Sequence, residues 1–165
     1  MSRADLYRSP VELMDLTRFY ADEVSSGCYP FIDFDPAERW HQRIYRDQRM
    51  DVWLISWLPS QGTELHDHGG SAGSFTVLTG RLREDVVTGA RLHEHDRRAG
   101  TTVGFGARYV HDVRNICEAP AVSVHAYSPP LKTMNFYDLA DGVLAPIASI
   151  ATEDPEPAVE IRRAS

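Results

Sequence analysis

The sequence predicts an all-β fold, a jelly-roll barrel with one α-helix in front of it, and three observations support this prediction. From about residue 39 onward, short runs of β-forming residues alternate with turn residues. Helical periodicity is confined to the residues before Gly27. Hydrophobic residues make up 42% of the 165 residues, which suffices for one domain with its own core. Many short strands indicate a sandwich or barrel, and the jelly-roll barrel is the form that holds ligands inside.

A helix is expected over about residues 9–27. Ser9-Pro10-Val11-Glu12 has the pattern of a capping box with proline at the first helical position, and Gly27 marks the end. The residues of the expected apolar face are Val11, Met14, Leu16, Phe19, Tyr20 and Val24. A second, short helical turn is expected near Pro36.

The barrel is expected over about residues 39–140. Its candidate strands are about residues 39–46, 51–58, 63–68, 74–79, 81–87, 101–104, 109–116, 121–127 and 133–138. Turn residues such as Gly69-Gly70 and Pro129-Pro130 separate them. The tail over about residues 152–165 contains Glu-Asp-Pro-Glu-Pro and is expected to be mobile. Without a visible repeat, residues 1–165 are expected to form a single domain.

Charge and composition limit the possible partners. A net charge of −7 argues against nucleic acid or an anionic membrane as the main partner. The start of the chain lacks the apolar run of a signal peptide, and no stretch approaches the roughly 20 apolar residues that span a bilayer. Cys28 and Cys117 form no Cys-x-x-Cys pair, which fits a reducing compartment. We therefore expect a cytoplasmic protein, and a barrel that stands alone as a monomer.

His66, His68 and His111 are the candidate metal ligands. In a β-strand, residues i and i+2 point to the same face, so the His-x-His pair directs two imidazoles at one point and another strand supplies the third. A metal held by three neutral imidazoles keeps its double charge and has open coordination positions, which favours chemistry over a structural role. The ligands alone leave the metal open, because zinc, nickel and copper also bind three imidazoles.

A second His-x-His pair, His93-Glu94-His95, serves as an internal comparison. Its charged neighbours are typical of a solvated surface at an exposed hairpin end. The pair around Asp67 is instead followed by the small residues from Gly69 to Gly73, which leave space for a ligand to enter.

Two further groups are candidates for ligand contacts. On a strand, Ser123, His125 and Tyr127 share one face, where the histidine can hydrogen-bond and orient the tyrosine hydroxyl; the alternative is a tyrosine that merely satisfies its own hydroxyl. Arg43 shares a strand face with His41 and Tyr45. An inward arginine would bind a carboxylate, whereas an outward one would form a surface salt bridge, and a slip of one residue would bring Gln42 inward instead.

Together these elements resemble the cysteine dioxygenase branch of the cupin superfamily, whose fold is a double-stranded β-helix (jelly-roll) barrel. The resemblance covers about residues 40–138. The segments that carry it are His66-Asp-His68, Leu78-Thr-Gly-Arg-Leu-Arg-Glu84, His111-x-x-x-Asn115 and His125-x-Tyr127-Ser-Pro-Pro130. The first cupin motif usually has a glutamate after the second histidine, and here that place holds Gly73. Animal members have a cysteine there that crosslinks to the tyrosine, so this chain resembles the bacterial members and no thioether is expected.

The resemblance also implies roles for the candidate residues. His66, His68 and His111 would bind Fe(II), Tyr127 would be the catalytic tyrosine and His125 would orient it. The residues that would bind the substrate are Arg43, Trp57, Ile55 and His41, the last at a place where the family often has a tyrosine.

The implied function is a thiol dioxygenase that oxidises L-cysteine with O2 to cysteine sulfinic acid, with a small thiol and O2 as its only partners. One alternative is a dioxygenase for another thiol, such as 3-mercaptopropionate, cysteamine or a larger thiol metabolite. The relatives that oxidise 3-mercaptopropionate carry glutamine where the cysteine enzymes carry arginine. Another alternative is a non-enzymatic cupin that binds a metal or small molecule, which would consume no oxygen with thiols.

Overall fold

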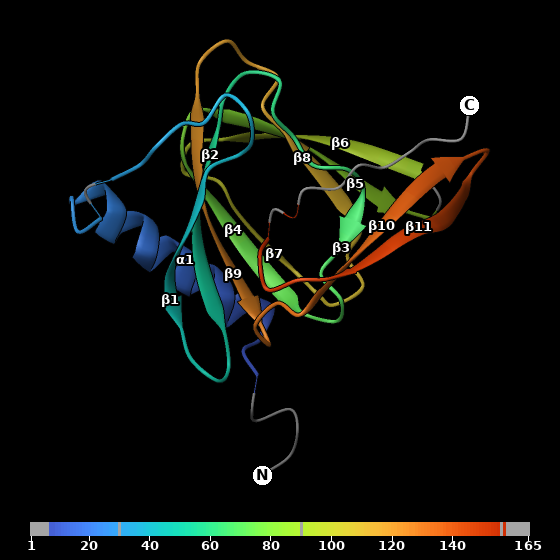
Figure 1. The fold of residues 1–165 in the computed structure, drawn as a ribbon, viewed down its shortest axis with the longest axis horizontal. Coiled ribbons are helices and arrows are strands. Elements are labelled where there is room, and N and C mark those ends of the chain that lie inside the picture. Colours follow the sequence, from blue (N-terminus) through green and yellow to red (C-terminus); the bar gives the residue numbers. More distant parts are fainter. Residues whose placement is uncertain (1–6, 30, 90, 156, 158–165) are drawn as a thin grey trace.

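A computed structural model of the chain describes residues 7–29, 31–89, 91–155 and 157. The described part consists of two antiparallel sheets that face each other and a helix, α1 (Pro10–Ser25), packed outside one of them (Figure 1). The first sheet has the strand order β1-β2-β9-β4-β7: β1 (His41–Arg46), β2 (Asp51–Trp57), β4 (Ala72–Thr79), β7 (Thr102–Phe105) and β9 (Ala121–Ser128). The second has the order β11-β10-β3-β8-β5-β6: β3 (His66–Asp67), β5 (Arg81–Thr88), β6 (Arg91–Arg98), β8 (His111–Arg114), β10 (Thr133–Ala140) and β11 (Val143–Ala151). The predicted all-β architecture with an N-terminal helix is confirmed.

The capping box at the start of α1 is confirmed. The backbone N–H of Glu12 donates to the Ser9 hydroxyl at 3.3 Å, and the Ser9 N–H donates to the Glu12 carboxylate at 2.8 Å. The two contacts satisfy N–H groups that would otherwise lack partners at the helix start. Gly27 follows the last turn with φ +84°, a conformation that glycine adopts without strain.

The buried face of α1 differs from the predicted one. Val11 and Phe19 are 68% and 54% exposed, whereas Leu13 and Thr17 are fully buried. The reason is a polar contact that hydrophobic periodicity does not detect. The Thr17 hydroxyl lies 3.0 Å from the Ser74 hydroxyl and accepts from Thr76 at 2.9 Å, which attaches the helix to β4.

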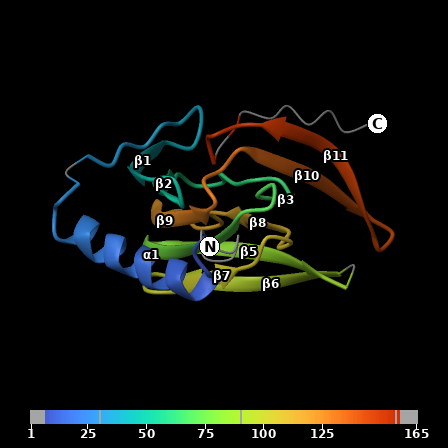
Figure 2. The same ribbon diagram turned by 90° about the horizontal axis from the view of Figure 1, so that it is seen from below.

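The core has two layers, separated by the first sheet (Figure 2). Every residue of β2 is buried, and successive side chains alternate between the layers. Trp53, Ile55 and Trp57 enter the layer between the two sheets, while Val52 and Leu54 pack in the layer under α1. The inner layer is therefore where side chains from both sheets meet.

Each of the nine predicted strands contains an observed strand, but β6 and β11 lie outside them. The His93-Glu94-His95 pair lies within β6, an edge strand paired along its whole length with β5. The prediction that the pair lies at the end of a hairpin was wrong, but His93 and Glu94 are exposed as predicted. Charged side chains are compatible with an edge strand because one face of it meets water. The segment around Pro36 forms bends, not the expected helical turn.

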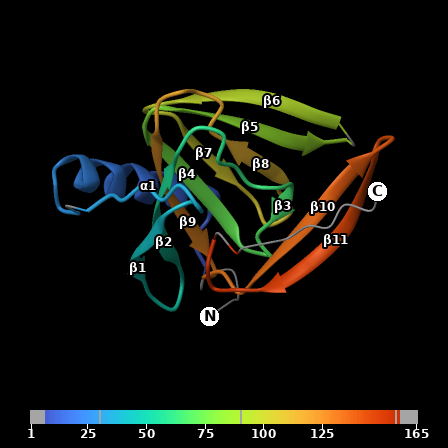
Figure 3. The same ribbon diagram turned by 45° about the horizontal axis from the view of Figure 1, so that its top comes forward.

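The beginning of the expected mobile tail is packed against the barrel. After β11 the chain turns back toward the middle of the molecule (Figure 3), and Pro155 is buried. Residues 156 and 158–165 of this tail lie outside the described residues. Residues 1–6, on which the prediction about a signal peptide depends, lie outside them as well. Over the described ranges, no helix is long and apolar enough to cross a membrane.

Candidate metal centre

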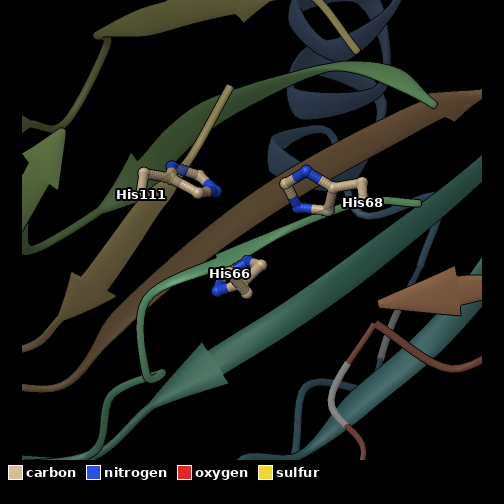
Figure 4. Close-up of side chains that lie close together, drawn as sticks. All are labelled: His66, His68 and His111. Carbon is tan, nitrogen blue, oxygen red and sulfur yellow. The ribbon is translucent and has the colours of Figure 1, made fainter. Parts of the chain in front are cut away.

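The second sheet positions the three candidate ligands. His66 lies on β3, His68 directly follows that strand, and His111 lies on β8 opposite His66 in the antiparallel register. Strand alternation sends Asp67 to the other face, where its carboxylate accepts from Asn135 at 2.8 Å and from Tyr137 at 2.6 Å. The three imidazoles point toward one common space (Figure 4).

The geometry of this cluster suits a single metal ion. One ring nitrogen from each of His66, His68 and His111 lies within 4.8 Å of the others, and each residue is at most 3% exposed. The predicted convergence is therefore what the structure shows. The donor set consists of imidazoles alone, which transition metals accept in place of the oxygen donors that calcium and magnesium require.

Hydrogen bonds hold two of the rings and select their tautomers. The Nδ1 atom of His66 lies 2.7 Å from the Glu64 carbonyl oxygen, and that of His111 lies 2.8 Å from the Glu84 carboxylate. Because both partners are acceptors, each Nδ1 carries the proton and leaves the Nε2 lone pair available. Such partners orient metal-binding histidines in many proteins.

Glu84 supports the site without belonging to the ligand cluster. It is fully buried, and its two oxygens also accept from Arg97 at 2.8 Å and from Tyr109 at 2.9 Å. Burial alone would raise the pKa of Glu84, but the hydrogen bond and charge of His111, together with Arg97, outweigh it and lower that pKa. The carboxylate thus stays ionised as a partner of His111.

Two of the candidate ligands, His66 and His68, are neutral at neutral pH. Burial lowers the pKa of His66 and of His68 well below the ordinary value of 6.5, and the neighbouring histidines lower both further. A neutral imidazole is the form that binds a metal.

A chain of hydrogen bonds faces this cluster from β9 in the first sheet. The Trp57 indole N–H donates to the Ser123 hydroxyl at 2.8 Å, and that hydroxyl lies 2.8 Å from Nε2 of His125. The Nδ1 atom of His125 lies 3.3 Å from the Tyr127 hydroxyl. The Tyr127 ring centre is 4.8 Å from that of His68, so the chain ends beside the metal cluster.

The first donor of this chain is fixed, because an indole N–H only donates and the Ser123 oxygen accepts from Trp57. The same oxygen can give its own proton to His125 Nε2 or accept a second N–H from it, so His125 has two consistent tautomers. In the first, His125 carries its proton on Nδ1 and donates to Tyr127, whose O–H is left to donate elsewhere. Burial, then the charge of Asp51, raises the pKa of Tyr127, which keeps that proton in place. Burial lowers the pKa of His125 to about 3, so its ring stays neutral.

Gly73 leaves room that an aromatic ring fills. A Cβ atom at Gly73 would overlap the Phe105 ring and come within 3.1 Å of Tyr127. Phe105 in turn stacks on His68 with ring centres 5.0 Å apart. Where the resemblance places a crosslinking cysteine in animal members, this chain therefore has a ring packed against a candidate ligand.

The residues expected to bind the substrate are distributed differently from the prediction. Arg43 pairs with Trp53 and shares its inward face, but it is exposed because β1 is an edge strand, and its guanidinium carbon lies 5.3 Å from the Trp53 ring centre. Gln42 pairs with Leu54 on the opposite face. A bulge after Arg43 also moves Tyr45 away from the predicted face, next to Tyr20.

The other three predicted binding residues contact protein groups. Ile55 is fully buried in the inner core, and the indole N–H of Trp57 is bonded to Ser123. His41 lies 2.7 Å from the Asp154 carboxylate. A cavity opens between the segment before β1, the residues leading into β3 and strand β10, and none of these three residues lines it.

Arg39, which sequence reasoning missed, lines this cavity together with Arg114. Its guanidinium carbon lies 5.4 Å from the Trp57 ring centre. Burial and the charge of Arg114 lower the pKa of Arg39 to about 10, so it remains cationic at neutral pH, and its charge acts on His66 and Tyr127. The sequence signal for Arg39 was strand alternation, because residues 39, 41 and 43 of an extended segment point to the same side.

Comparison with known sequences identifies similar proteins over most of the chain. A family model described as cysteine dioxygenase type I matches residues 10–140. Cysteine dioxygenase type 1 of Rattus norvegicus is 27% identical over 173 aligned residues, which cover 86% of this chain and 86% of the rat protein. The human protein of that name is 28% identical over 107 residues, or 57% of this chain and 52% of the human one.

Solved structures support the fold. A protein from Thermus thermophilus is 24% identical with a TM-score of 0.55, covering 62% of this chain and 93% of that protein. An uncharacterized protein with a double-stranded beta-helix domain from Klebsiella pneumoniae is 16% identical with a TM-score of 0.53, covering 71% of this chain and 90% of that one. An RmlC-like cupin from Desulfovibrio desulfuricans is 14% identical with a TM-score of 0.53, covering 62% of this chain and 93% of that protein. The predicted cupin double-stranded β-helix is thereby confirmed.

Proposed function

The chain belongs to the cysteine dioxygenase type I family, and on that premise we propose that it oxidises L-cysteine with O2 to cysteine sulfinic acid at a three-histidine Fe(II) centre. The reaction adds both oxygen atoms to sulfur, R–SH + O2 → R–SO2H, so it balances without another reductant. The observation that carries this proposal is a buried cluster of three imidazoles that faces a buried tyrosine.

His66, His68 and His111 would hold the ferrous ion through nitrogen atoms. A bound ferrous ion would supply the redox chemistry that joins O2 to a thiolate sulfur. Three neutral ligands leave its full double charge in the site, which favours the thiolate over the thiol form of a substrate. Glu84 contributes by fixing the His111 ring, not by neutralising the metal.

Tyr127 would donate a hydrogen bond to the substrate or to oxygen. Its O–H is available when His125 donates to the same oxygen from Nδ1, and its raised pKa prevents loss of the proton. Holding reacting groups in place in this way can lower a barrier by several kcal/mol, on the order of 7–11 in the best cases.

Arg39 would bind the substrate carboxylate, in place of the predicted Arg43. Its guanidinium lines the cavity, retains its charge and acts on both His66 and Tyr127, so an acid-bearing thiol at the metal would meet it. Arginine suits this role because its planar fork matches both oxygens of a carboxylate.

Oxygen uptake by Fe(II)-loaded protein tests the proposal. With L-cysteine, we expect one O2 consumed per thiol and a product heavier by both oxygen atoms, detected by mass analysis. Faster turnover of 3-mercaptopropionate, cysteamine or a larger thiol would support the thiol dioxygenase activity but assign it another substrate. Metal binding without oxygen uptake with any thiol would refute the enzymatic activity and indicate a metal-binding protein.

We further propose that the protein works as a monomer in the cytoplasm. Cys28 and Cys117 are both free thiols, which fits a reducing compartment. Helix α1 covers the outer face of the first sheet, so that face needs no second chain to bury it.

A further inference from the structure

A cavity of about 510 Å³ opens beside the metal cluster. It lies between the segment before β1, the residues leading into β3, strand β10 and the C-terminal segment, and its lining includes Arg39, Glu64, Phe136 and Pro155. The Phe136 ring centre is 6.0 Å from that of His66, so one residue of the lining lies against a candidate ligand, although none of the three candidate ligands lines the cavity itself. Cavities of roughly 300–1,000 Å³ hold drug-sized ligands, so this one is much larger than an amino acid of cysteine's size requires.

The segment of residues 152–155, called the strap below, forms one side of this cavity. It starts at the end of β11, where the Thr152 N–H donates to the Lys132 carbonyl at 3.0 Å. The Thr152 hydroxyl accepts from the Asp154 N–H at 2.9 Å, which closes a local turn and directs Pro155 into the protein, where it is buried.

Two carboxylates tie the strap to β1. Arg46 donates two hydrogen bonds to Glu153, at 2.9 and 3.1 Å. Asp154 lies 2.7 Å from Nε2 of His41. The carboxylates are 63% and 43% exposed, so both ties are partly screened by water and can break without unfolding the barrel.

The tie at His41 depends on its protonation. Its Nδ1 lies 3.2 Å from the Arg39 carbonyl oxygen and its Nε2 faces Asp154, so both ring nitrogens meet acceptors. Only the imidazolium has two N–H groups to satisfy both. The hydrogen bond to Asp154 is the main cause that raises the pKa of His41, and Glu38 adds to it, while the Trp53 ring lies on another side at 5.8 Å. The tie is therefore complete below a pH of 6.5 and weakens as the pH rises through the raised pKa.

We propose that the strap is a specificity-determining wall of the substrate entrance: tied to β1 through His41 and Arg46, it limits the size of the thiol that reaches the metal cluster. This inference rests on the proposed thiol dioxygenase function. When the ties break, the same cavity would admit thiols larger than cysteine.

The first test cuts both ties with the double variant Glu153→Ala/Asp154→Ala. We expect kcat/KM for glutathione, a bulky thiol, to rise about tenfold relative to that for L-cysteine, a change of the size that pocket walls impose. Glu118→Ala removes another exposed carboxylate, between β8 and β9, and should leave the ratio as in the parent protein. An unchanged ratio in the double variant overturns the proposal.

The second test needs no turnover, so it separates failure of the strap from failure of the proposed function. Ferrozine captures iron from anaerobic Fe(II)-loaded protein, and the double variant should lose iron faster than the parent, by about tenfold. The ratio of the two rates should be largest below pH 6.5 and should fall, as His41 loses its proton, to the part that the Arg46–Glu153 tie still contributes. If the parent protein and the double variant lose iron at equal rates at low pH, the proposed role of the strap is wrong, even if no thiol is oxidised. Faster iron loss from the variant supports that role whether or not the protein oxidises thiols.

Discussion

Hydrogen-bond partners decide what the individual side chains of the site can do. Glu84 accepts from His111, so a carboxylate close to the cluster serves as a partner of a ligand. Trp57 donates to Ser123 at the start of a chain that ends at Tyr127. At the residue scale, donors and acceptors of fixed type limit where each proton can lie.

Replacing Tyr127 by phenylalanine removes the proposed donor and little else. We expect the variant to bind iron like the parent protein and to lose about 10²-fold in kcat, within the usual contribution of a positioned proton donor. Oxygen-electrode rates and metal analysis measure the two effects. A kcat equal to that of the parent would remove Tyr127 from the mechanism.

Two tryptophans of β2 offer a matched pair for testing the chain of hydrogen bonds. Trp57→Phe removes the donor to Ser123, and we expect kcat to fall about fivefold with little change in KM, because one lost hydrogen bond of about 1 kcal/mol leaves Tyr127 less well directed. Trp53→Phe removes an indole outside that chain and should keep kcat near the parent value. Equal losses in the two variants would mean that packing, not direction, matters.

Alanine variants distinguish the role of Arg39, which precedes β1, from that of Arg43, which lies on it. Arg39→Ala should raise KM for L-cysteine by about tenfold or more, since hydrogen bonds between charged groups contribute about 1.5–3 kcal/mol. Cysteamine lacks the carboxylate and should show little change in KM. Arg43→Ala, which alters only an exposed residue, is the control. If Arg43→Ala has the larger effect on cysteine, the corrected assignment is refuted.

At the scale of elements, the packing of β4 against β7 shapes the site. Gly73 pairs with Phe105 on one side and with Tyr127 on the other. The missing side chain lets the Phe105 ring lie against His68, so this strand pair supports a candidate ligand from the opposite sheet. The strap and β1 make a second such pair of elements, joined by ion pairs instead of a ladder.

Gly73→Ala is expected to disturb this contact. The added methyl group would push Phe105 off His68 and lower the free energy of unfolding by about 1–3 kcal/mol, the usual cost of overpacking. Denaturant unfolding measures the loss, and weaker iron binding should accompany it. Gly106→Ala, at a position where a Cβ atom meets nothing within 4 Å, is the matched control. Equal stability of the two variants would count against the packing role of Gly73.

At the scale of the whole molecule, the two sheets supply different halves of the site. The candidate ligands come from the second sheet, whereas the hydrogen-bond chain and its tyrosine come from the first. The site therefore exists only when both sheets are packed together. A metal bound there should couple to folding, because it binds the folded state alone.

Metal binding is accordingly expected to raise the Tm. At a free Fe(II) or Zn(II) concentration about 100 times Kd, the gain is about 2.7 kcal/mol, and thermal unfolding with and without metal measures it. His68→Ala should abolish most of this gain. His93→Ala alters the exposed His-x-His pair on β6 and should retain it, so loss of the gain in both variants would point to nonspecific metal binding.

Local patterns predicted much of this protein. The capping box at Ser9, the parity of β9 and the convergence of the His-x-His pair with His111 all depend on neighbours close in the chain or on strand alternation, and all were foreseen. The buried face of α1 was not, because Thr17 is held by hydroxyl groups on a strand that is distant in sequence.

The sequence by itself determined the chemical groups and their spacing: three imidazoles without a carboxylate, a tyrosine beside a histidine, and arginines near the first strand. Only the tertiary structure decided that Arg39 reaches the cavity while Arg43 lies exposed, that Trp57 donates into the chain that ends at Tyr127, and that Pro155 of the strap lines the cavity. The physical reason is that these outcomes depend on the bulge in β1, on the edge position of that strand and on contacts between residues more than 60 positions apart. Strand parity groups residues 39, 41 and 43, but no periodicity within that segment says which of them reaches the cavity.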